Sequence, residues 1–321
     1  MSESFYPKNK KLVNKNIEKL LKNNFLDHRF CNLIDIDAIS SLDTYKPNSV
    51  IFLKNIFNKF DNQDCHIITS NSDLYKNDKY LNITLVKDLN HSYNTIVNHI
   101  YHHEDSLGYY DEFKFINNSH ISIYSDIDPS TLIFNNCVIG RGVKIGKNCI
   151  IKNNVVIKNS YIGNDVIICD NTTIGSTGFG FDLKKMGSKN LNPQIGSVII
   201  EDGVYIGSNC AIDRGKIDST LIGKNSMLDN QIHIAHNVHL GENACIAAQS
   251  GISGSTKIGK NLIAGGQSGF AGHLEIGDNV VVAAKSGVTK NIVSNSFIAG
   301  FPAIDINKWK KMMINLKKYG H

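Results

Sequence analysis

Three histidines follow one another at intervals of three residues in the stretch QIHIAHNVHLG, which covers residues 231–241. They are His233, His236 and His239. Imidazole is a common general base near neutral pH and a common metal ligand. The spacing alone fits a metal site, a catalytic base with two neighbouring histidines, or an exposed polar surface. The elements that carry the histidines must decide among these.

The composition is that of a globular protein: of 321 residues, 41% are hydrophobic and 20% are charged, with a mild net charge of +5. No run of about 18 apolar residues predicts a membrane span, and the first residues lack the apolar core of a signal peptide. Seven cysteines without a CxxC pair favour a reducing compartment over a disulfide framework. We therefore expect a cytoplasmic protein without membrane insertion, and we expect no nucleic-acid partner.

Aliphatic or aromatic residues recur at every sixth position, a spacing that fits neither an α-helix nor a simple strand. The series runs through Ile133, Ile139, Ile145, Ile151 and Ile157, restarts one residue early at Ile162, Ile168 and Ile174, and continues from Ile222 as Leu228, Ile234, Leu240, Ile246, Ile252, Ile258, Ala264, Phe270, Ile276, Val282 and Val288. Such hexapeptide repeats are typical of a parallel β-helix, in which three repeats form one coil of about 18 residues. Glycines that often follow the series are expected to occupy corners with a positive φ.

A second position, two residues before each member of the series, is expected to face the interior where there is less room. It holds Cys137, Cys149, Val155, Cys210, Ser250, Ser268 and Ser286. Three of the cysteines are therefore predicted to be packing residues.

The segment before the repeats, residues 1–105, lacks the six-residue spacing and predicts a small α/β domain. Its expected strands are Ser49–Leu53, Cys65–Thr69 and Ile83–Val86, and its expected helices are Lys15–Lys22 and Ser92–His102. Residues 106–130 are expected to link this domain to the solenoid at 131–303. A loop at 176–194 interrupts the solenoid, and long loops inserted into compact scaffolds are often functional.

The C-terminal segment, residues 304–321, predicts a basic helix. Its apolar stripe consists of Trp309, Met312, Met313 and Leu316. Its basic residues are Lys308, Lys310, Lys311, Lys317 and Lys318. The helix either docks on the rest of the protein with its basic face in solvent or offers a surface to an acidic partner.

The six-residue spacing predicts which way the three histidines point. If Ile234 and Leu240 point inward, all three histidines face outward, and His233 and His239 lie on two different sides of a triangular coil. A metal site built from the three within one chain is therefore not expected, although ligands shared between chains remain open.

A step of about 18 residues leads one coil along the solenoid at the same lateral position. From His233 and from His236 it leads to two columns of glycine: Gly251, Gly269 and Gly287, and Gly254 and Gly272. Columns without side chains predict an outward groove for a long, thin ligand. His236 would then be a general base, and the N–H of Gly254 would stabilise an oxyanion. Asp229 and Asn230, earlier on the same coil, are candidates to orient His236 or to hold a polar substrate.

These residues also carry a resemblance. The stretch MLDNQIHIAHNVHLGENACIAAQSGISGSTKIG, then GGQSGFAGHLEIGDNVVV, with AIDRG at 211–215, resembles the UDP-3-O-(3-hydroxyacyl)glucosamine N-acyltransferases of lipid A biosynthesis. The resemblance covers about 130–305 closely and the N-terminal domain loosely. It implies a homotrimeric left-handed β-helix with an N-terminal uridine-binding domain and a C-terminal helical segment.

The resemblance also implies a reaction. A 3-hydroxyacyl chain would pass from acyl carrier protein to the 2-amino group of a UDP-linked, 3-O-acylated glucosamine, with no cofactor beyond the carrier's phosphopantetheine. His236 would take the proton of the amine, and His273 would contact the nucleotide sugar. Asp229, Asn230 and Asn237 stand where the family places polar substrate contacts. The glycine columns would become the pantetheine and acyl channel, and the basic helix would meet the carrier protein.

The chain departs from the family pattern around the expected uracil site. The family holds uracil with a Phe, an Asn three residues later and a Tyr three residues beyond. Phe52 and Asn55 match, but Asn58 stands at the Tyr position, with Phe57 or Phe60 as candidates for the second ring. In the channel, Gly287 stands where family members carry a chain-ending methionine, which predicts acceptance of longer acyl chains.

Several alternatives remain. One is another hexapeptide acyltransferase, using acetyl-CoA on a nucleotide sugar or acting as an O-acyltransferase on UDP-N-acetylglucosamine; the glycine groove favours a long chain over acetyl. Another is a metalloenzyme resembling the γ-type carbonic anhydrases, with histidines shared across chains. The last is a solenoid without catalytic activity.

Overall fold

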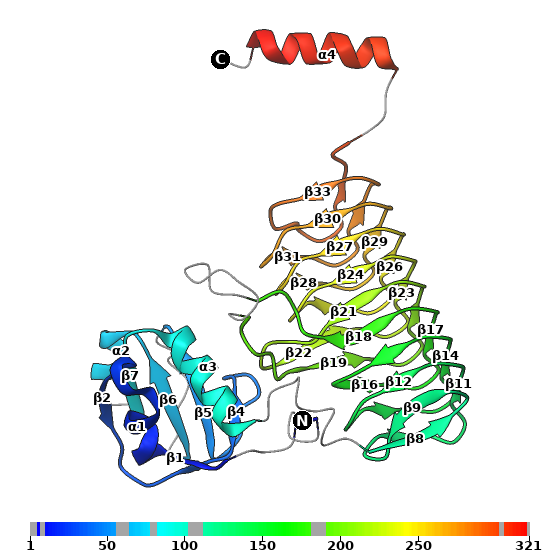
Figure 1. Cartoon of the computed structure of the whole chain (residues 1–321). Helices are drawn as coiled ribbons and strands as arrows, with labels where there is room; N and C mark the ends of the chain where they lie inside the picture. Colours follow the sequence, from blue (N-terminus) through cyan, green and yellow to red (C-terminus); the bar gives the residue numbers. More distant parts are fainter. Residues whose placement is uncertain are drawn as a thin grey trace.

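The computed structural model describes residues 5–6, 10–55, 64–77, 82–101, 112–180, 191–301 and 305–319. A small N-terminal domain lies beside one end of a long solenoid, and a C-terminal helix lies beyond the other end (Figure 1). In the same described segments, none of the helices combines the length and apolar character needed to cross a membrane.

The N-terminal domain is built on one mixed sheet whose strand order is β2, β7, β6, β5, β4. These strands are β2 (Phe25–Arg29), β4 (Ala38–Ser40), β5 (Ser49–Leu53), β6 (Cys65–Thr69) and β7 (Ile83–Val86), and a separate pair is β1 (Leu12–Val13) with β3 (Asp35–Ile36). The three predicted strands are confirmed as β5, β6 and β7. They are parallel and largely buried, which fits their near-continuous apolar sequence.

The helices of this domain differ in detail from the prediction. The segment predicted as one helix is a helical run of η2 (Asn14–Asn16), α1 (Ile17–Leu21) and η3 (Lys22–Asn24), and α2 (Ser72–Lys76) adds a further short helix. Helix α3 (Leu89–Ile100) begins three residues before the predicted start. Its start is fixed by Asp88, whose side chain accepts a hydrogen bond of 3.1 Å from the His91 N–H.

The solenoid consists, in the described part of the chain, of three long sheets of very short strands. The first contains β10 (Asp126–Ile127), β13 (Lys144–Ile145), β16 (Ser160–Ile162), β19 (Ser197–Ile200), β22 (Ser219–Ile222), β25 (His239–Leu240), β28 (Lys257–Ile258) and β31 (Glu275–Ile276). The second contains β11 (Leu132–Ile133), β14 (Ile150–Ile151), β17 (Ile167–Ile168), β20 (Tyr205–Ile206), β23 (Met227–Leu228), β26 (Cys245–Ile246), β29 (Ile263–Ala264), β32 (Val281–Val282) and β34 (Phe297–Ile298). The third contains β8 (Phe113–Ile116), β9 (Ser119–Ser122), β12 (Val138–Ile139), β15 (Val156–Ile157), β18 (Thr173–Ser176), β21 (Ala211–Asp213), β24 (His233–Ile234), β27 (Gly251–Ile252), β30 (Gly269–Phe270) and β33 (Gly287–Val288).

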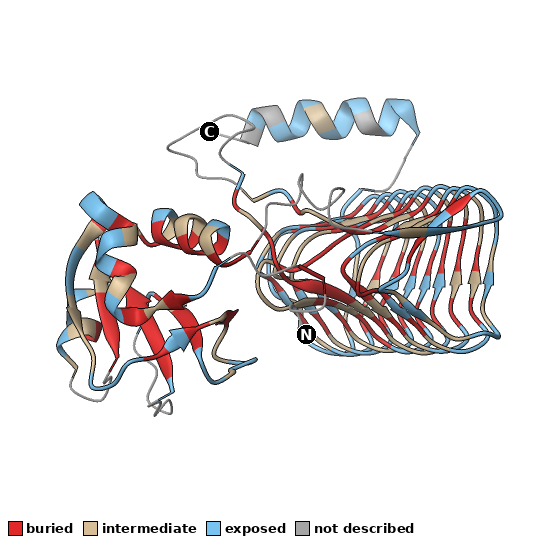
Figure 2. Ribbon diagram, turned by 60° about the horizontal axis from the view of Figure 1, so that its bottom comes forward, coloured by how far each residue is buried: buried red, intermediate tan, exposed pale blue. Residues whose placement is uncertain are grey.

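The six-residue series forms the interior, as predicted for a parallel β-helix. Ile234 pairs in register with Ile252, and Ile252 pairs with Phe270, so the series stacks from coil to coil. Figure 2 shows buried residues recurring along every coil, with exposed residues between them. The second inward position is buried as well, including the thiols of Cys137, Cys149 and Cys210, whose predicted packing role is confirmed.

The solenoid begins earlier than the predicted boundary at residue 131. Strand β9 pairs in parallel with β12, and β10 pairs in parallel with β13, so both already belong to the solenoid. The reason lies in Ile121 and Ile127, which continue the six-residue spacing upstream of Ile133. The predicted linker at 106–130 therefore extends too far. Strand β8 folds back antiparallel on β9 at this end of the third sheet.

The corners differ from the expectation that glycine supplies the positive φ. Most positive-φ corner residues are asparagines, such as Asn148 with φ 55°. Most of the glycines after the series serve a different need, which is the close approach of the next coil; Gly175, with φ 80°, does have a positive φ. A Cβ on Gly146 would lie 2.6 Å from the carbonyl oxygen of Gly163.

Corner asparagines also bond to one another between coils. Asn243 Nδ2 donates to Asn261 Oδ1 at 3.2 Å, and Asn261 Nδ2 donates to Asn279 Oδ1 at 2.8 Å. Asn279 Nδ2 continues the ladder to Asn295 Oδ1 at 3.0 Å. An asparagine at such a corner therefore adopts the left-handed backbone conformation, and its side chain also bonds its coil to the next.

Candidate active site

His236 lies at the corner between β24 and β25 and is half-buried. Its Nδ1 lies 3.2 Å from Oδ1 of Asn237. The same Asn237 oxygen accepts a hydrogen bond of 2.9 Å from the backbone N–H of Lys216. An amide oxygen that already serves one N–H acts as an acceptor, so Nδ1 of His236 carries its proton toward Asn237 and Nε2 is left as the basic nitrogen.

The imidazole of His236 lies between two glycines. A Cβ built on Gly254, one coil further, would lie 2.8 Å from both Cε1 and Nε2 of His236. A Cβ on Gly178 would lie 2.9 Å from the Cβ of His236. Both positions therefore have to lack a side chain for the ring to lie where it does.

Gly178 belongs to the described start of the inserted loop, and a glutamine fixes it against His236. The Gly178 N–H donates to Oε1 of Gln194 at 2.8 Å, and Nε2 of Gln194 donates to the Gly178 carbonyl at 3.2 Å. The rest of the predicted functional loop, residues 181–190, lies outside the described residues. The ends of the loop thus cover one face of the histidine.

Arg214 holds both ends of this loop on the solenoid. Its guanidinium is buried and donates to the carbonyl oxygens of Gln194 and Gly175, both at 2.8 Å, and to the Thr177 hydroxyl at 2.7 Å. Donors that diverge in three directions require the planar fork of arginine. Arg214 therefore positions Gly178, and through it His236.

Asp213 is the carboxylate of this corner. It is buried, and its Oδ2 lies 3.7 Å from Nε2 of His233 on the neighbouring strand. Burial raises the pKa of Asp213, and the nearby charges of His233, His236 and Arg214 act in the opposite direction. His233 is thus paired with a carboxylate, whereas His239 lies exposed on the next side of the coil.

The first glycine column forms as the step of about 18 residues from His233 predicts. His233 pairs with Gly251, Gly251 with Gly269, and Gly269 with Gly287. A Cβ on any of these three glycines would meet nothing within 4 Å, so the column faces open space. In the second column, a Cβ on Gly272 would meet the carbonyl oxygen of Gly254 at 3.2 Å.

The other predicted site residues fall in two places. His273 is exposed on the same edge as His236, and its N–H donates to the Gly254 carbonyl at 3.0 Å. Asp229 and Asn230 lie at the preceding corner, where Asp229 accepts from the backbone of Asn230 at 2.7 Å and of Ala248 at 3.2 Å. Within one chain, Asn237 rather than Asp229 is therefore placed to orient His236.

In the N-terminal domain, Phe52 lies on β5 and Asn55 follows that strand with its side chain exposed. The ring of Phe52 packs edge-on against Tyr93 of α3, with 5.3 Å between the ring centroids. The candidates for the second uracil ring, Phe57 and Phe60, and the departing Asn58 lie outside the described residues.

A short excursion of the solenoid, Asp213–Asp218, joins the site to the N-terminal domain. The Tyr93 hydroxyl donates to the carbonyl oxygens of Pro193 at 2.9 Å and Lys216 at 3.2 Å. Asp218 accepts hydrogen bonds from the hydroxyls of Ser41 at 2.7 Å and Thr44 at 2.6 Å. The N-terminal domain is thus fixed next to the corner that carries His236.

Asp213, Arg214 and Lys216 are site residues that the repeat analysis missed. The signal was present, because Ile212 and Ile222 lie ten residues apart where the series allows six. An excursion of this kind marks a segment that leaves the coil to contact another part of the protein.

Among the described residues, no three His, Cys, Asp or Glu side chains gather as ligands would. His233 lies beside the buried carboxylate of Asp213, and His236 lies beside the open column of glycines.

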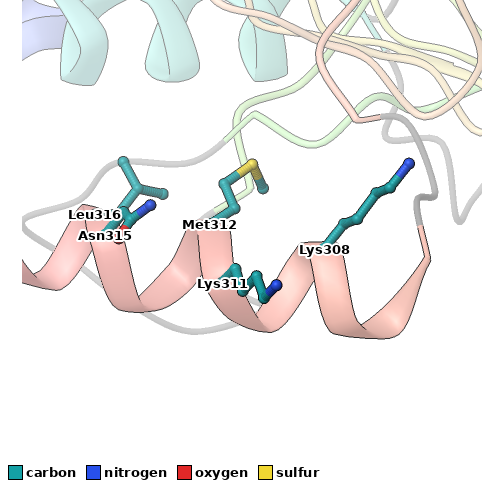
Figure 3. Close-up of a pocket in the computed structure, with 5 residues that line it drawn as sticks. All are labelled: Lys308, Lys311, Met312, Asn315 and Leu316. Atoms are coloured by element: carbon teal, nitrogen blue, oxygen red, sulfur yellow. The ribbon is translucent and has the colours of Figure 1, made fainter.

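Helix α4 (Ile306–Tyr319) carries the predicted apolar and basic residues. Met312, Ile314 and Leu316 are exposed, and so are Lys308 and Lys311. A shallow hollow on this helix is lined by Lys308, Lys311, Met312, Asn315 and Leu316 (Figure 3).

Comparisons with known proteins agree with the repeats. Residues 124–159 and 219–254 match the family described as bacterial transferase hexapeptide (six repeats). Among solved structures, LpxA from Acinetobacter baumannii has 25% identity and a TM-score of 0.52, covering 62% of this chain and 77% of that chain. The UDP-N-acetylglucosamine acyltransferase of Francisella novicida has 21% identity and a TM-score of 0.53, over 62% of this chain and 73% of that chain. The solenoid is accordingly a left-handed parallel β-helix.

Curated relatives are more similar in sequence. UDP-3-O-acylglucosamine N-acyltransferase of Hydrogenovibrio crunogenus is 45% identical over 191 residues, 60% of this chain and 53% of that protein. The enzyme of the same name from Rhizobium rhizogenes is 48% identical over 79 residues, 25% of this chain and 22% of that protein. The matched part of the chain thus spans about half the length of the first relative and less than a quarter of the second. By these matches, the chain is a hexapeptide-repeat protein homologous to the UDP-3-O-acylglucosamine N-acyltransferases.

Proposed function

We propose that this protein is an N-acyltransferase of lipid A biosynthesis. It would move a 3-hydroxyacyl chain from acyl carrier protein to the 2-amino group of UDP-3-O-acylglucosamine. The observation that carries the proposal is the position of His236, whose imidazole lies against Gly254 beside an open column of glycines. The names of the sequence relatives support the same reaction.

His236 acts as the general base in this proposal. Its Nε2 takes a proton from the sugar amine as the amine nitrogen attacks the thioester carbonyl. The hydrogen bond from Nδ1 to Asn237 selects the tautomer that can do so. The buried carboxylate of Asp213 lies close enough to interact with the charge that His236 gains.

Gly254 supplies the oxyanion donor. Among the hydrogen bonds that the described residues form, none uses the Gly254 N–H as donor. When the amine attacks, negative charge develops on the former carbonyl oxygen, and a free N–H one coil from the base stabilises it. The thiolate of the carrier then leaves as the tetrahedral intermediate collapses, and no further cofactor is needed.

The remaining components receive the two substrates. The open column of Gly251, Gly269 and Gly287 receives the pantetheine and acyl chain. Phe52 and Asn55 receive the uracil, and His273 contacts the nucleotide sugar. The exposed lysines of α4 attract the acidic carrier protein.

The proposed assembly is a homotrimer in the cytoplasm. Asp229 and Asn230 lie at the other corner of the coil from His236, so in a trimer they would contribute to the substrate site of a neighbouring chain. Sedimentation equilibrium measures the assembly directly, and a monomer at micromolar concentration would contradict it.

A turnover assay tests the function. Purified protein is given UDP-3-O-acylglucosamine with 3-hydroxyacyl carrier protein, or with acetyl-CoA, and N-acylated product is measured. We expect product only from the carrier thioester, and a loss of at least about 100-fold in kcat for His236→Ala. His239→Ala, an exposed histidine of the same coil, is the matched control and should retain activity. Acetyl transfer as the faster reaction, or full activity of His236→Ala, would reject the proposal.

A further inference from the structure

Two lysines lie near the place where the N-terminal domain joins the solenoid. Lys54 follows β5 with its side chain exposed, and Lys216 lies half-buried in the excursion Asp213–Asp218. The ammonium of Lys216 lies 4.1 Å from the centroid of the Tyr93 ring. Burial lowers the pKa of Lys216, and the positive charge of Lys54 acts in the same direction.

No carboxylate neutralises this pair in the described part of the chain, where neither lysine forms a salt bridge. Of the two acids in the same excursion, Asp218 is bound by the hydroxyls of Ser41 and Thr44, and Asp213 lies beside His233. The Tyr93 ring stabilises the charge of Lys216 in part, and an anion that joins both lysines would stabilise it further. The arrangement therefore points to an anionic ligand.

The position of Lys216 indicates which anion. On one side its ammonium lies on Tyr93, whose ring packs against Phe52 at 5.3 Å. On the other side its backbone N–H donates to Asn237, which also binds Nδ1 of His236. Lys216 thus lies between the aromatic residue expected to hold a nucleobase and the imidazole expected to act on a sugar amine. In a nucleotide sugar, the diphosphate lies between these two parts.

We propose that Lys216 and Lys54 bind the diphosphate of the nucleotide-sugar substrate. This inference rests on the proposed function, because it adopts from that proposal the binding of the nucleobase at Phe52 and the position of the reacting amine at His236. Ammonium groups bind phosphate oxygens through charge-assisted hydrogen bonds, and bringing two of them together suits a group that carries two charges. The lysines determine affinity for the diphosphate and take no part in proton transfer.

Calorimetric titration of the full-length protein tests the inference with two probes, UDP and uridine. Lys54→Ala and Lys216→Gln should each weaken UDP binding by about tenfold, because a charge-assisted hydrogen bond is lost. Uridine lacks phosphate, so its affinity should not change in either variant. Lys257→Ala, an exposed lysine of β28, is the control and should bind both probes like the wild type.

The outcomes separate this inference from the proposed function. If the wild type binds UDP and both variants bind it equally well, the lysine assignment is wrong while the acyltransferase proposal stands. If the wild type binds neither probe, both fail. Unchanged UDP affinity together with a raised KM for the carrier protein would assign the lysines to the phosphopantetheine phosphate and overturn the inference. A lowered melting temperature of Lys216→Gln with unchanged UDP affinity would assign Lys216 a structural role only.

Discussion

The imidazole of His236 lies directly against the backbone of Gly254, one coil further along the solenoid. A single methyl group on Gly254 would come within 2.8 Å of two ring atoms, Cε1 and Nε2. The proposed base and the proposed oxyanion donor are thus held at a separation that leaves no room for a side chain on Gly254. Two successive coils act here as one unit.

The first prediction follows from that contact. Gly254→Ala should lower kcat by at least about tenfold, because the new methyl group displaces the imidazole, and ring displacement is costly in a site that depends on orientation. Overpacking of this kind should also cost about 1–3 kcal/mol of folding free energy. Steady-state kinetics and urea unfolding measure the two effects. Gly140→Ala is the control, since its methyl group would meet no atom closer than 3.5 Å.

The second prediction concerns the acyl chain. A side chain on Gly287 would extend into open space, so Gly287→Met should fold normally and obstruct the glycine column. We expect the variant to prefer shorter acyl chains than the wild type does, with the greatest loss for the longest. Competition between carrier proteins loaded with chains of graded length measures the preference. Unchanged selectivity would show that the column is not the acyl channel.

The third prediction concerns the loop that covers His236. Arg214→Lys should destabilise the protein by about 2–5 kcal/mol, because one ammonium cannot reach the three acceptors that the buried guanidinium binds. Activity should fall as well, since Gly178 is then released from His236. Chemical denaturation gives the stability. Arg141→Lys, at a cation–π contact 3.7 Å from the Tyr124 ring centroid, should cost less than about 1 kcal/mol.

The fourth prediction concerns pH and the N-terminal domain. His66 is buried, with Nε2 at 2.8 Å from the Thr84 hydroxyl, and burial, assisted by the charge of His28, lowers its pKa from 6.5 to about 3. The unfolded chain binds a proton below pH 6.5 while the folded domain does not, so the stability present above that pH is lost as the pH falls toward 3. The loss approaches about 1.4 kcal/mol per pH unit in this window.

Urea unfolding of the domain between pH 7 and pH 4 measures that slope. His66→Gln, which keeps a hydrogen-bonding side chain without a titrating ring, should flatten it. His91→Gln, an exposed histidine on α3, should leave it unchanged. Equal slopes in the wild type and in His66→Gln would show that His66 is not the responsible group.

The sequence predicted the solenoid in detail because one physical requirement repeats in every coil. Ile234, Ile252 and their equivalents must fill a narrow interior, and the same spacing fixes which residues stack. For that reason the column from His233 to Gly287 was predictable in register. Ile121 and Ile127 share the same six-residue spacing, so the early start of the solenoid is encoded in the sequence as well.

The surroundings of His236 were harder to predict. Gln194 and Arg214 contact the loop through bonds between residues that no repeat relates, and Lys216 meets Tyr93 across more than a hundred positions of sequence. Such long-range contacts depend on how two domains dock, which local spacing does not encode. For a related reason the spacing does not reveal the role of most glycines that follow the series, because the close approach of the next coil exists only in three dimensions.

The asparagine ladder at the corners has a consequence for how such a chain evolves. Asn243, Asn261 and Asn279 each need a counterpart at the same angular position one turn away. Gain or loss of sequence is therefore accommodated as complete turns, as a slightly shortened turn such as the one that ends at Ile162, or as outward detours such as the one at Arg214 and Lys216. Variation within the homologous enzymes should concentrate at detours of this kind, so new substrate contacts can arise there while the stacked scaffold stays intact.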